Sequence, residues 1–397
     1  MGLDRMMMAA ISWGDRVVPK GTSVVVRTLP DISDQGVAVV EALMRLDHPP
    51  RLTWLLDDPS GPLASEFGCR VVRARSLAGV FAYWRAKVVV HTHGVFGSRP
   101  ASARKIFVNV WHGMPVKRLD PGAEVALHQT DFTLATAPVH AEHLATTWDL
   151  PLDRVLLTGL PRNDLLLGST SNGATPLPPS LAARVAGRPL VVWLPTYRTA
   201  VRGHLRAEGV ELGNVTQFEG ADLAAVERMA GRLGIHVLIK VHPLAELPRV
   251  VESDHLTVWS TDDLHDHGVT LYPLLSVADV LITDHSSVWI DFLLTGRPMV
   301  FAISDLEEYR ASRGHYFEDL SSLLPGPIAA DLTELEALLA ASIGGEDAWR
   351  EARRRSLDMH HIYQDAASAD RVATIVEEMA NGRSELTSRR IAHPSPR

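Results

Sequence analysis

Residues 274–301 read LLSVADVLITDHSSVWIDFLLTGRPMVF. A short apolar run is followed by a polar turn, a longer apolar segment and a second short apolar run. The runs VLITD (280–284) and PMVFAI (298–303) have the length and composition of buried strands. Between them, SVWIDFLLT (287–295) predicts a helix that ends at Gly296. A strand, a helix and a second strand in this order predict a parallel sheet with covered faces.

The same alternation of strands and helices extends from about residue 22 to about residue 380, which predicts an α/β protein. Further strands are expected at SVVVRTL (23–29), RLTWLL (51–56), CRVVRA (69–74), KVVVHT (87–92), IFVNVW (106–111), FTLATA (132–137), RVLLTG (154–159), PLVVWLP (189–195), IHVLIKV (235–241) and TVWS (257–260). Helices are expected at GVAVVEALMRL (36–46), LAAVERMAGRLG (223–234) and ELEALLAASIG (334–344).

A segment rich in Gly, Ser and Pro, residues 166–189, separates two series of strands and predicts an interdomain linker. The expected organisation is an N-terminal extension (1–21), a first domain (22–165), the linker (166–189), a second domain (190–380) and a disordered tail (381–397). Two doubly wound domains would bind a ligand in the cleft between the carboxyl ends of their strands.

Composition limits the class of protein. The 397 residues are 46% hydrophobic, as in soluble proteins, and a formal net charge of -8 argues against a general nucleic-acid binder. Cys69 is the only cysteine, so an intrachain disulfide is excluded and a reducing cytosol is expected. No apolar run approaches the roughly 18–20 residues that span a bilayer, so any membrane contact is expected to be peripheral.

The polar turn in the opening stretch has two interpretations. Its five residues, Thr283, Asp284, His285, Ser286 and Ser287, follow a strand and precede a helix, and Ser286 or Asp284 is the expected N-cap. Backbone N–H groups and hydroxyls at a helix start favour an anion. An ordinary solvated cap explains the same residues, and the turn alone does not decide between them.

Two other strand ends carry candidate functional histidines. In IKVHPLAEL, Lys240 and His242 follow a strand and are suited to hold a phosphate, although a surface lysine and a structural histidine would look the same. In NVWHGMPVKRLD, His112 ends a strand and Gly113 allows a sharp turn or close ligand approach. A histidine in this position suits proton transfer near neutral pH, and a structural role is the alternative.

The remaining candidates also lie near strand ends. In LLTGLPRNDLL, Arg162 could clamp a phosphate, and Asn163 or Asp164 could cap a helix. In VVWLPTYRTA, Thr196 and Arg198 repeat this pattern in the second series. His91 and His93 leave open a metal site or a structural role, and no dense cluster of acidic ligands is evident.

Six motifs occur in a fixed order: WHGMPVK (111–117), GLPRND (159–164), PTYR (195–198), KVHP (240–243), TDHSS (283–287) and DLEEYRASRGHYF (305–317). In their order and residues they resemble the motifs of the CDP-glycerol glycerophosphotransferases, the teichoic-acid polymerase and primase group. The resemblance covers about residues 22–380. It implies a GT-B-like fold, with two Rossmann-like domains and a central cleft, and transfer of glycerol phosphate from CDP-glycerol to a hydroxyl with release of CMP. The first domain (22–165) would serve the acceptor and carry the catalytic base, and the second (190–380) would bind the CDP-polyol donor.

The resemblance also implies roles for single residues. His112 would be the catalytic base, and His242 would contact the diphosphate and assist the leaving group. Ser286 and Ser287 would bind the diphosphate, and Asp291, one helical turn beyond Ser287, would fix the turn or reach a donor hydroxyl. The implied donor-binding set is Gly113, Arg162, Asn163, Asp164, Thr196, Arg198, Lys240, Thr283, Asp284, Ser286, Ser287 and Asp291. No cofactor and no nucleic acid are implied, and a metal requirement stays open.

The implied acceptor is a lipid-linked polymer of a cell wall or capsule, which would bring the protein to the inner face of the membrane, where Lys117 and Arg118 would help it dock. Departures from the family motifs, Met114 for Thr, Lys240 for Arg and His285 for an aromatic residue, affect the substrate more than the reaction. Ribitol phosphate or a sugar phosphate is therefore an alternative, and a fused second enzyme is not expected. There are two competing interpretations. One is a GT-B glycosyltransferase or epimerase that uses a nucleotide sugar, and the other is a non-catalytic nucleotide-binding relative.

Overall fold

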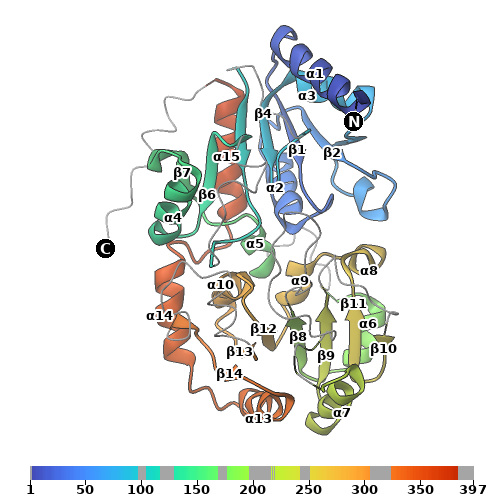
Figure 1. Ribbon diagram of the computed structural model, residues 1–397, viewed down its shortest axis with the longest axis vertical. Coiled ribbons are helices and arrows are strands. Elements are labelled where there is room, and N and C mark those ends of the chain that lie inside the picture. The colour runs from blue at the N-terminus through green and yellow to red at the C-terminus, as the bar shows by residue number, and fades with distance from the viewer. Residues whose placement is uncertain are drawn as a thin grey trace. The chain divides into compact units, whose positions relative to one another are not determined.

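The computed structural model forms two compact units, and each contains one sheet (Figure 1). The first unit comprises Met1–Met114, Leu119–Leu165 and His361–Arg397, and the second comprises Pro115–Arg118 and Leu166–His360. The structure describes residues 2–96, 104–116, 129–168, 177–195, 216, 218, 220–241, 251–304 and 323–382.

The sheet of the first unit has seven parallel strands in the order β3-β2-β1-β4-β5-β6-β7. They are β1 (Ser23–Arg27), β2 (Leu52–Leu56), β3 (Arg70–Arg73), β4 (Ala86–His91), β5 (Ile106–Asn109), β6 (Phe132–Ala135) and β7 (Val155–Leu157). Helices and 3-10 turns connect or cover them: α1 (Gly2–Val17), α2 (Asp34–Met44), η1 (Pro62–Ser65), α3 (Leu77–Arg85), α4 (Pro138–Trp148), η3 (Leu152–Arg154), α5 (Arg162–Leu166) and α15 (Ser368–Ala380).

Both faces of this sheet are buried, which explains the unbroken apolar runs of its central strands. Successive strand residues point to opposite faces. Val25 and Val89 cluster with Tyr83 of α3 and Ile11 of α1 on one face. Their neighbours in β1 and β4 face the other way, and α2 and α15 pack together against these two strands (Figure 1).

The sheet of the second unit has the order β10-β11-β9-β8-β12-β13-β14. Its strands are β8 (Leu190–Leu194), β9 (His236–Lys240), β10 (Val251–Glu252), β11 (Leu256–Trp259), β12 (Val280–Thr283), β13 (Met299–Ala302) and β14 (Ile328–Ala329), of which only β10 pairs antiparallel. The other elements are α6 (Pro179–Val185), α7 (Leu223–Leu233), α8 (Thr261–Asp266), α9 (Leu271–Leu275), α10 (Val288–Phe292), η4 (Leu293–Thr295), α13 (Leu332–Ile343) and α14 (Arg350–His360).

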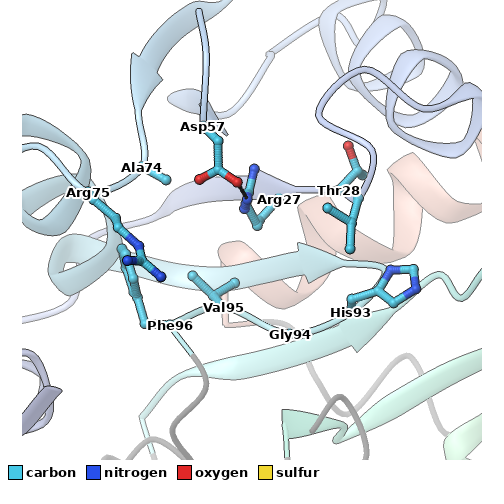
Figure 2. A pocket seen from close by; sticks show the side chains of 10 residues that line it. Arg27, Thr28, Asp57, Ala74, Arg75, His93, Gly94, Val95 and Phe96 are labelled. Atoms are coloured by element: carbon cyan, nitrogen blue, oxygen red, sulfur yellow. Dashed lines mark hydrogen bonds and ion pairs between the residues drawn. The ribbon is translucent and has the colours of Figure 1, made fainter. Parts of the chain in front are cut away.

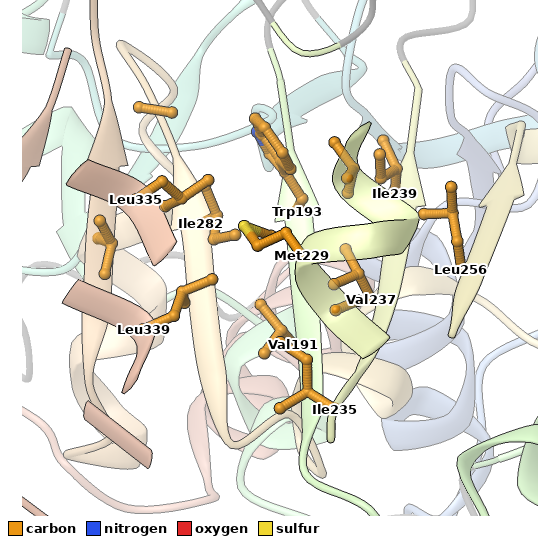
Figure 3. Packing of buried hydrophobic residues seen from close by; sticks show 14 of the residues in the cluster. Val191, Trp193, Met229, Ile235, Val237, Ile239, Leu256, Ile282, Leu335 and Leu339 are labelled. Atoms are coloured by element: carbon orange, nitrogen blue, oxygen red, sulfur yellow. The ribbon is translucent and has the colours of Figure 1, made fainter. Parts of the chain in front are cut away.

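The core of the second unit lies between one face of this sheet and helices α7 and α13 (Figure 3). Trp193 and Ile282 project from the strands, Met229 from α7, and Leu335 and Leu339 from α13, and all five side chains are buried. This packing fixes the neighbouring strands β8, β9 and β12, whose carboxyl ends carry the predicted donor-binding residues.

The twelve strands expected from sequence coincide with β1–β9 and β11–β13. The four expected helices coincide with α2, α7, α13 and, for residues 287–295, α10 with η4. The two-residue strands β10 and β14 were not expected, because two residues are too short to show a periodicity. No helix among the described residues is long and apolar enough to cross a membrane.

The unit boundaries differ from the expected ones at three places. Within the expected extension (1–21), residues 2–17 form α1, where Gly14 lets the helix approach the Trp84 ring of α3. The expected linker, 166–189, contains α6, whose Leu181 is buried. Residues 361–380, assigned to the second domain, belong to the first unit because α15 packs on α2 and β4. Of the expected tail, residues 383–397 lie outside the described part of the chain.

Candidate functional site

The segment after β5 makes an unusual turn at Trp111, His112 and Gly113, which we call the WHG turn. Trp111 has a φ of 50° and Gly113 a φ of 148°, so two of its three residues have positive φ angles. A bulky residue with positive φ is costly, and such strain concentrates at functional sites. The Trp111 ring is buried and packs edge-on against Trp148, with 4.7 Å between ring centroids, which helps to offset that cost.

Two buried amide side chains hold the backbone of this turn. Asn109, the last residue of β5, accepts a hydrogen bond from the N–H of Trp111 through Oδ1 (2.9 Å). Gln35 of α2 donates through Nε2 to the carbonyl of Val110 (2.9 Å). The same Gln35 accepts the N–H of Arg162 through Oε1 (3.1 Å), so it joins the WHG turn to the GLPRND motif.

Arg162 completes this support. Its guanidinium is largely buried, and Nη1 donates to the carbonyl of His112 (2.7 Å). The sequence predicted that Arg162 binds the donor, and the described structure places it in the first unit, bonded to the turn that carries His112. The bond holds the backbone of His112 and does not use its imidazole.

The imidazole of His112 is exposed at the end of this rigid turn. It stacks on His93, with 5.0 Å between ring centroids and 8° between ring planes, and it also contacts Trp111. Burial lowers the pKa of His93, so this neighbour is neutral at physiological pH and places no positive charge beside His112. An exposed imidazole on an anchored backbone is suited to proton transfer.

The GLPRND motif also fastens the C-terminal helix to the first unit. Asp164 accepts hydrogen bonds from the N–H groups of Ser368 (2.9 Å) and Ala369 (2.7 Å), so it caps α15 from another part of the chain. Burial raises the pKa of Asp164 to about 6. Gly159 has a φ of 77°, and a Cβ there would come within 2.4 Å of Ser368 Oγ, so both its conformation and its surroundings require glycine. Asn163, also a predicted donor ligand, is buried beside them.

In the second unit, the TDHSS turn lies at the same sheet edge as Lys240. Lys240 ends β9 and Thr283 ends β12, and β8 lies between these parallel strands. Thr283, Asp284 and His285 are buried, whereas Ser286 and Ser287 are partly exposed. Among the five turn residues, the two serines are therefore the ones placed to meet a ligand. Thr283 and Asp284, also predicted to bind the donor, and His285, predicted to affect the substrate, are buried.

The expected N-cap is wrong. The N-cap of α10 is Ser287, and its side chain makes no capping hydrogen bond. Asp284 Oδ1 instead accepts the N–H of Ser286 (3.1 Å), and Ser286 Oγ accepts the N–H of Val288 (3.4 Å), so both side chains shape the turn before the helix. The expected helix stop at Gly296 is confirmed, with a φ of 67°.

Asp291 has a structural contact. Its buried carboxylate accepts a hydrogen bond from the hydroxyl of Tyr272 through Oδ2 (2.5 Å), which ties α10 to α9. Of the two roles that sequence suggested, this contact supports fixing the turn. The predictions for His242, Thr196 and Arg198, for Lys117 and Arg118, and for the motif at 305–317 lie outside the described residues.

Comparison with known proteins identifies the family. The model of the CDP-Glycerol:Poly(glycerophosphate) glycerophosphotransferase family matches residues 7–378. The chain belongs to this family. The prediction made from the six motifs is therefore confirmed.

Relatives in this family include the teichoic acid ribitol-phosphate primase of Bacillus spizizenii, which is 27% identical over 248 residues, or 62% of this chain and 59% of the relative. The teichoic acid glycerol-phosphate transferase of Staphylococcus aureus is 25% identical over 254 residues, or 59% of this chain and 61% of the relative. The chain thus matches less than two thirds of the length of either protein.

Solved structures confirm the predicted GT-B-like α/β fold. The wall teichoic acid polymerase TagF superposes with a TM-score of 0.74 at 18% identity, covering 96% of this chain and 94% of that one. The UDP-GlcNAc 2-epimerase of Neisseria meningitidis superposes with a TM-score of 0.52 at 12% identity, covering 89% and 98%. At these identities, the likeness concerns the fold alone.

The possible metal ligands of this glycerophosphotransferase-family chain do not form a cluster in the described ranges, where no three His, Cys, Asp or Glu side chains gather. His91 is fully engaged, because Nδ1 accepts the N–H of Gly94 (2.8 Å) and Nε2 donates to the carbonyl of Gln129 (2.6 Å). Burial lowers the pKa of His91 to about 4, so the ring is neutral and structural.

Sequence reasoning missed Gln35 and Asn109, which hold the WHG turn, and gave His93 no specific role. Gln35 stands in the first turn of an apolar helix, where a polar residue is ordinarily solvated, and here it is buried. Asn109 interrupts the apolar run IFVNVW, and this interruption was the available indication that its side chain has a special partner.

Proposed function

We propose that this protein transfers a polyol phosphate from a CDP-activated donor to a hydroxyl of a growing lipid-linked polymer of the cell wall or capsule. The acceptor oxygen attacks the phosphorus that carries the polyol. The bond from this phosphorus to the bridging oxygen breaks, and CMP leaves with that oxygen and its electron pair. The hydroxyl proton passes to a base. Family membership over residues 7–378 carries the proposal, since it covers both sheets.

In this proposal the base is His112. The strained WHG turn supports the assignment, because Asn109, Gln35 and Arg162 hold its backbone while the imidazole stays exposed. Phosphoryl transfer depends mainly on positioning and charge stabilisation, so a fixed base at a strand end is what the chemistry requires. Arg162 then acts on catalysis through His112 as a positioning residue.

The donor is proposed to bind in the second unit. Ser286 and Ser287 would hydrogen-bond the diphosphate, and Lys240 would supply positive charge from the end of β9, two strands away at the same sheet edge. His242, Thr196 and Arg198 would complete the site, with His242 assisting departure of CMP. Glycerol and ribitol are both candidate polyols, because the relatives are named for transfer of either one.

A binding screen followed by a transfer assay tests this function. We expect CDP-glycerol or CDP-ribitol, and CMP, to raise the melting temperature, because a ligand at a hundred times its Kd stabilises the native state by about 2.7 kcal/mol. With a polyol-phosphate acceptor, CMP should then be released in proportion to polymer extension. Stabilisation by UDP-sugars alone would favour a nucleotide-sugar enzyme. Binding of CDP-polyols without any turnover on a range of acceptors would identify a non-catalytic relative.

We further propose that the protein docks on the inner face of the membrane, where a lipid-linked acceptor would lie. Two exposed apolar stripes support this, and they lie on helices α1 and α3, which pack together. Trp13 is 66% exposed, Leu77 92% and Phe81 55%, and the exposed Arg85 follows Phe81 one turn later. Aromatic and basic side chains on one surface are suited to an anionic bilayer.

Replacing both Trp13 and Phe81 by Glu is expected to weaken binding to vesicles of anionic lipid by at least about tenfold, because burying such side chains contributes roughly 1.5–3 kcal/mol each. Vesicle sedimentation at low salt measures this. Leu152→Glu is the matched control, since Leu152 is an exposed leucine on η3 of the same unit. Equal sedimentation of the double variant and the wild type would contradict docking through these helices.

A further inference from the structure

A small cavity of about 280 Å³ lies within the first unit, at the carboxyl edge of its sheet (Figure 2). Arg27 ends β1, Asp57 follows β2, Arg75 follows β3, and His93 and Phe96 follow β4. These four strands are neighbours in the order β3-β2-β1-β4. Carboxyl ends of parallel strands are where open α/β sheets bind ligands.

The two arginines of this cavity differ in their surroundings. Arg27 forms ion pairs with Asp31 and Asp57, both with N–O distances of 2.5 Å, so two carboxylates compensate its charge. Arg75 is exposed, and no carboxylate in the described part of the chain forms an ion pair with it. Arg75 therefore contributes an uncompensated positive charge to the cavity, and its planar guanidinium is suited to bind a phosphate group.

His93 lies on the side of the cavity opposite Arg75 and stacks on the proposed base, His112 (Figure 2). Figure 2 shows Arg75 on one side and His93 on the other, with Gly94 and Val95 between them. The ring of His93 stacks on that of His112, with 5.0 Å between centroids. A molecule bound in the cavity would therefore have one end at Arg75 and the other end one ring from His112.

We propose that this cavity is the acceptor subsite, which binds the terminal polyol-phosphate unit of the growing polymer. Arg75 binds the phosphate of that unit, and the polyol extends along Val95 and Gly94 to His93, whose ring stacks on that of His112 (Figure 2). The size supports one small unit, since ligand pockets for larger molecules are roughly 300–1,000 Å³. The inference rests on the proposed function, because the cavity would bind the acceptor, which is the second substrate of that reaction beside the nucleotide donor.

The test separates binding of the acceptor from binding of the donor. In Arg75→Ala, we expect the KM for a glycerol-phosphate oligomer to rise about ten- to hundredfold, because charge-assisted hydrogen bonds to phosphate are lost. The KM for the CDP-polyol should stay unchanged, and Arg75→Lys should recover part of the loss. Arg73→Ala is the matched control, since Arg73 is an exposed arginine two residues earlier and outside the cavity.

A second measurement distinguishes failure of this inference from failure of the proposed function. Calorimetric titration of the oligomer into the wild type and Arg75→Ala, without any nucleotide, reports the subsite directly. If the wild type transfers polyol phosphate and the KM for the acceptor is the same in Arg75→Ala as in Arg73→Ala, the subsite assignment is overturned. If the oligomer binds in an Arg75-dependent way and no CDP-polyol supports transfer, the subsite stands and the proposed reaction falls.

Discussion

His112→Ala is expected to lower turnover by about 10²- to 10⁴-fold, the usual contribution of a general base. This corresponds to roughly 3–5 kcal/mol of transition-state stabilisation. Binding of CDP or CMP should stay close to that of the wild type, because the proposed donor residues belong to the second unit. Steady-state kinetics with the true donor and acceptor, together with nucleotide titration, measure the two effects.

A structural role for His112 would have a different outcome. The bond from Arg162 uses the carbonyl of His112, which alanine retains, and the imidazole is exposed. We therefore expect the variant to fold with nearly the stability of the wild type. His48→Ala is a suitable control, since His48 is an exposed histidine of the same unit. A folded His112→Ala protein with near wild-type turnover would refute the assignment.

The strands could be predicted from sequence because their character is local. Runs such as VVV at 24–26 and VVV at 88–90 are buried on both faces of a parallel sheet, so each needs only its own composition to be recognised. Ser286 and Ser287 were also recognisable, because a polar turn between a strand and a helix is a local pattern. Six ordered motifs then identified the family at low overall identity.

The features that could not be predicted depend on contacts distant in sequence. Sequence predicted that Asp164 caps a local helix or binds the donor. In the structure Asp164 caps α15, where it accepts the N–H of Ser368, 204 residues later in the chain. This contact also explains why α15 belongs to the first unit. Gln35 bonds to Val110, 75 residues away, and nothing in its own helix indicates this partner.

The second large effect is expected for Asp15→Asn, at the end of α1. Asp15 and Lys105 form a buried ion pair with a distance of 2.5 Å, and their side chains are 1% and 0% exposed. Lys105 also donates to the carbonyl of Tyr83 and lies over its ring. Asp15 pairs with Lys20 as well (2.7 Å), so one carboxylate compensates two lysines. Removing one partner of a buried pair costs about 3–5 kcal/mol, because the other charge stays buried.

The size of this loss should depend on pH. Burial lowers the pKa of Lys105 to about 7, against the attraction of Asp15, and losing Asp15 should lower it further. The lysine pKa in the unfolded chain is about 10.4, so between the folded and unfolded pKa values the unfolded state binds more protons. In this window the unfolding free energy rises with pH in both proteins alike. Below about pH 7, Lys105 is protonated in the folded wild type but not in the folded variant, whose lysine pKa is lower, so the variant should lose more stability at pH 6 than at pH 9.

Chemical denaturation of the wild type and Asp15→Asn at pH 6 and pH 9 tests this. Asp58→Asn is the matched control, because Asp58 forms an exposed ion pair with Arg73 (3.4 Å), and exposed pairs contribute little. We expect that control to leave the unfolding free energy nearly unchanged at both pH values. A loss for Asp15→Asn as small as that of the control, or one that grows from pH 6 to pH 9, would show that the Lys105 charge is not what Asp15 compensates. Because Asp15 lies on α1, the same variant should also loosen the helix that carries Trp13, and vesicle binding should fall with stability.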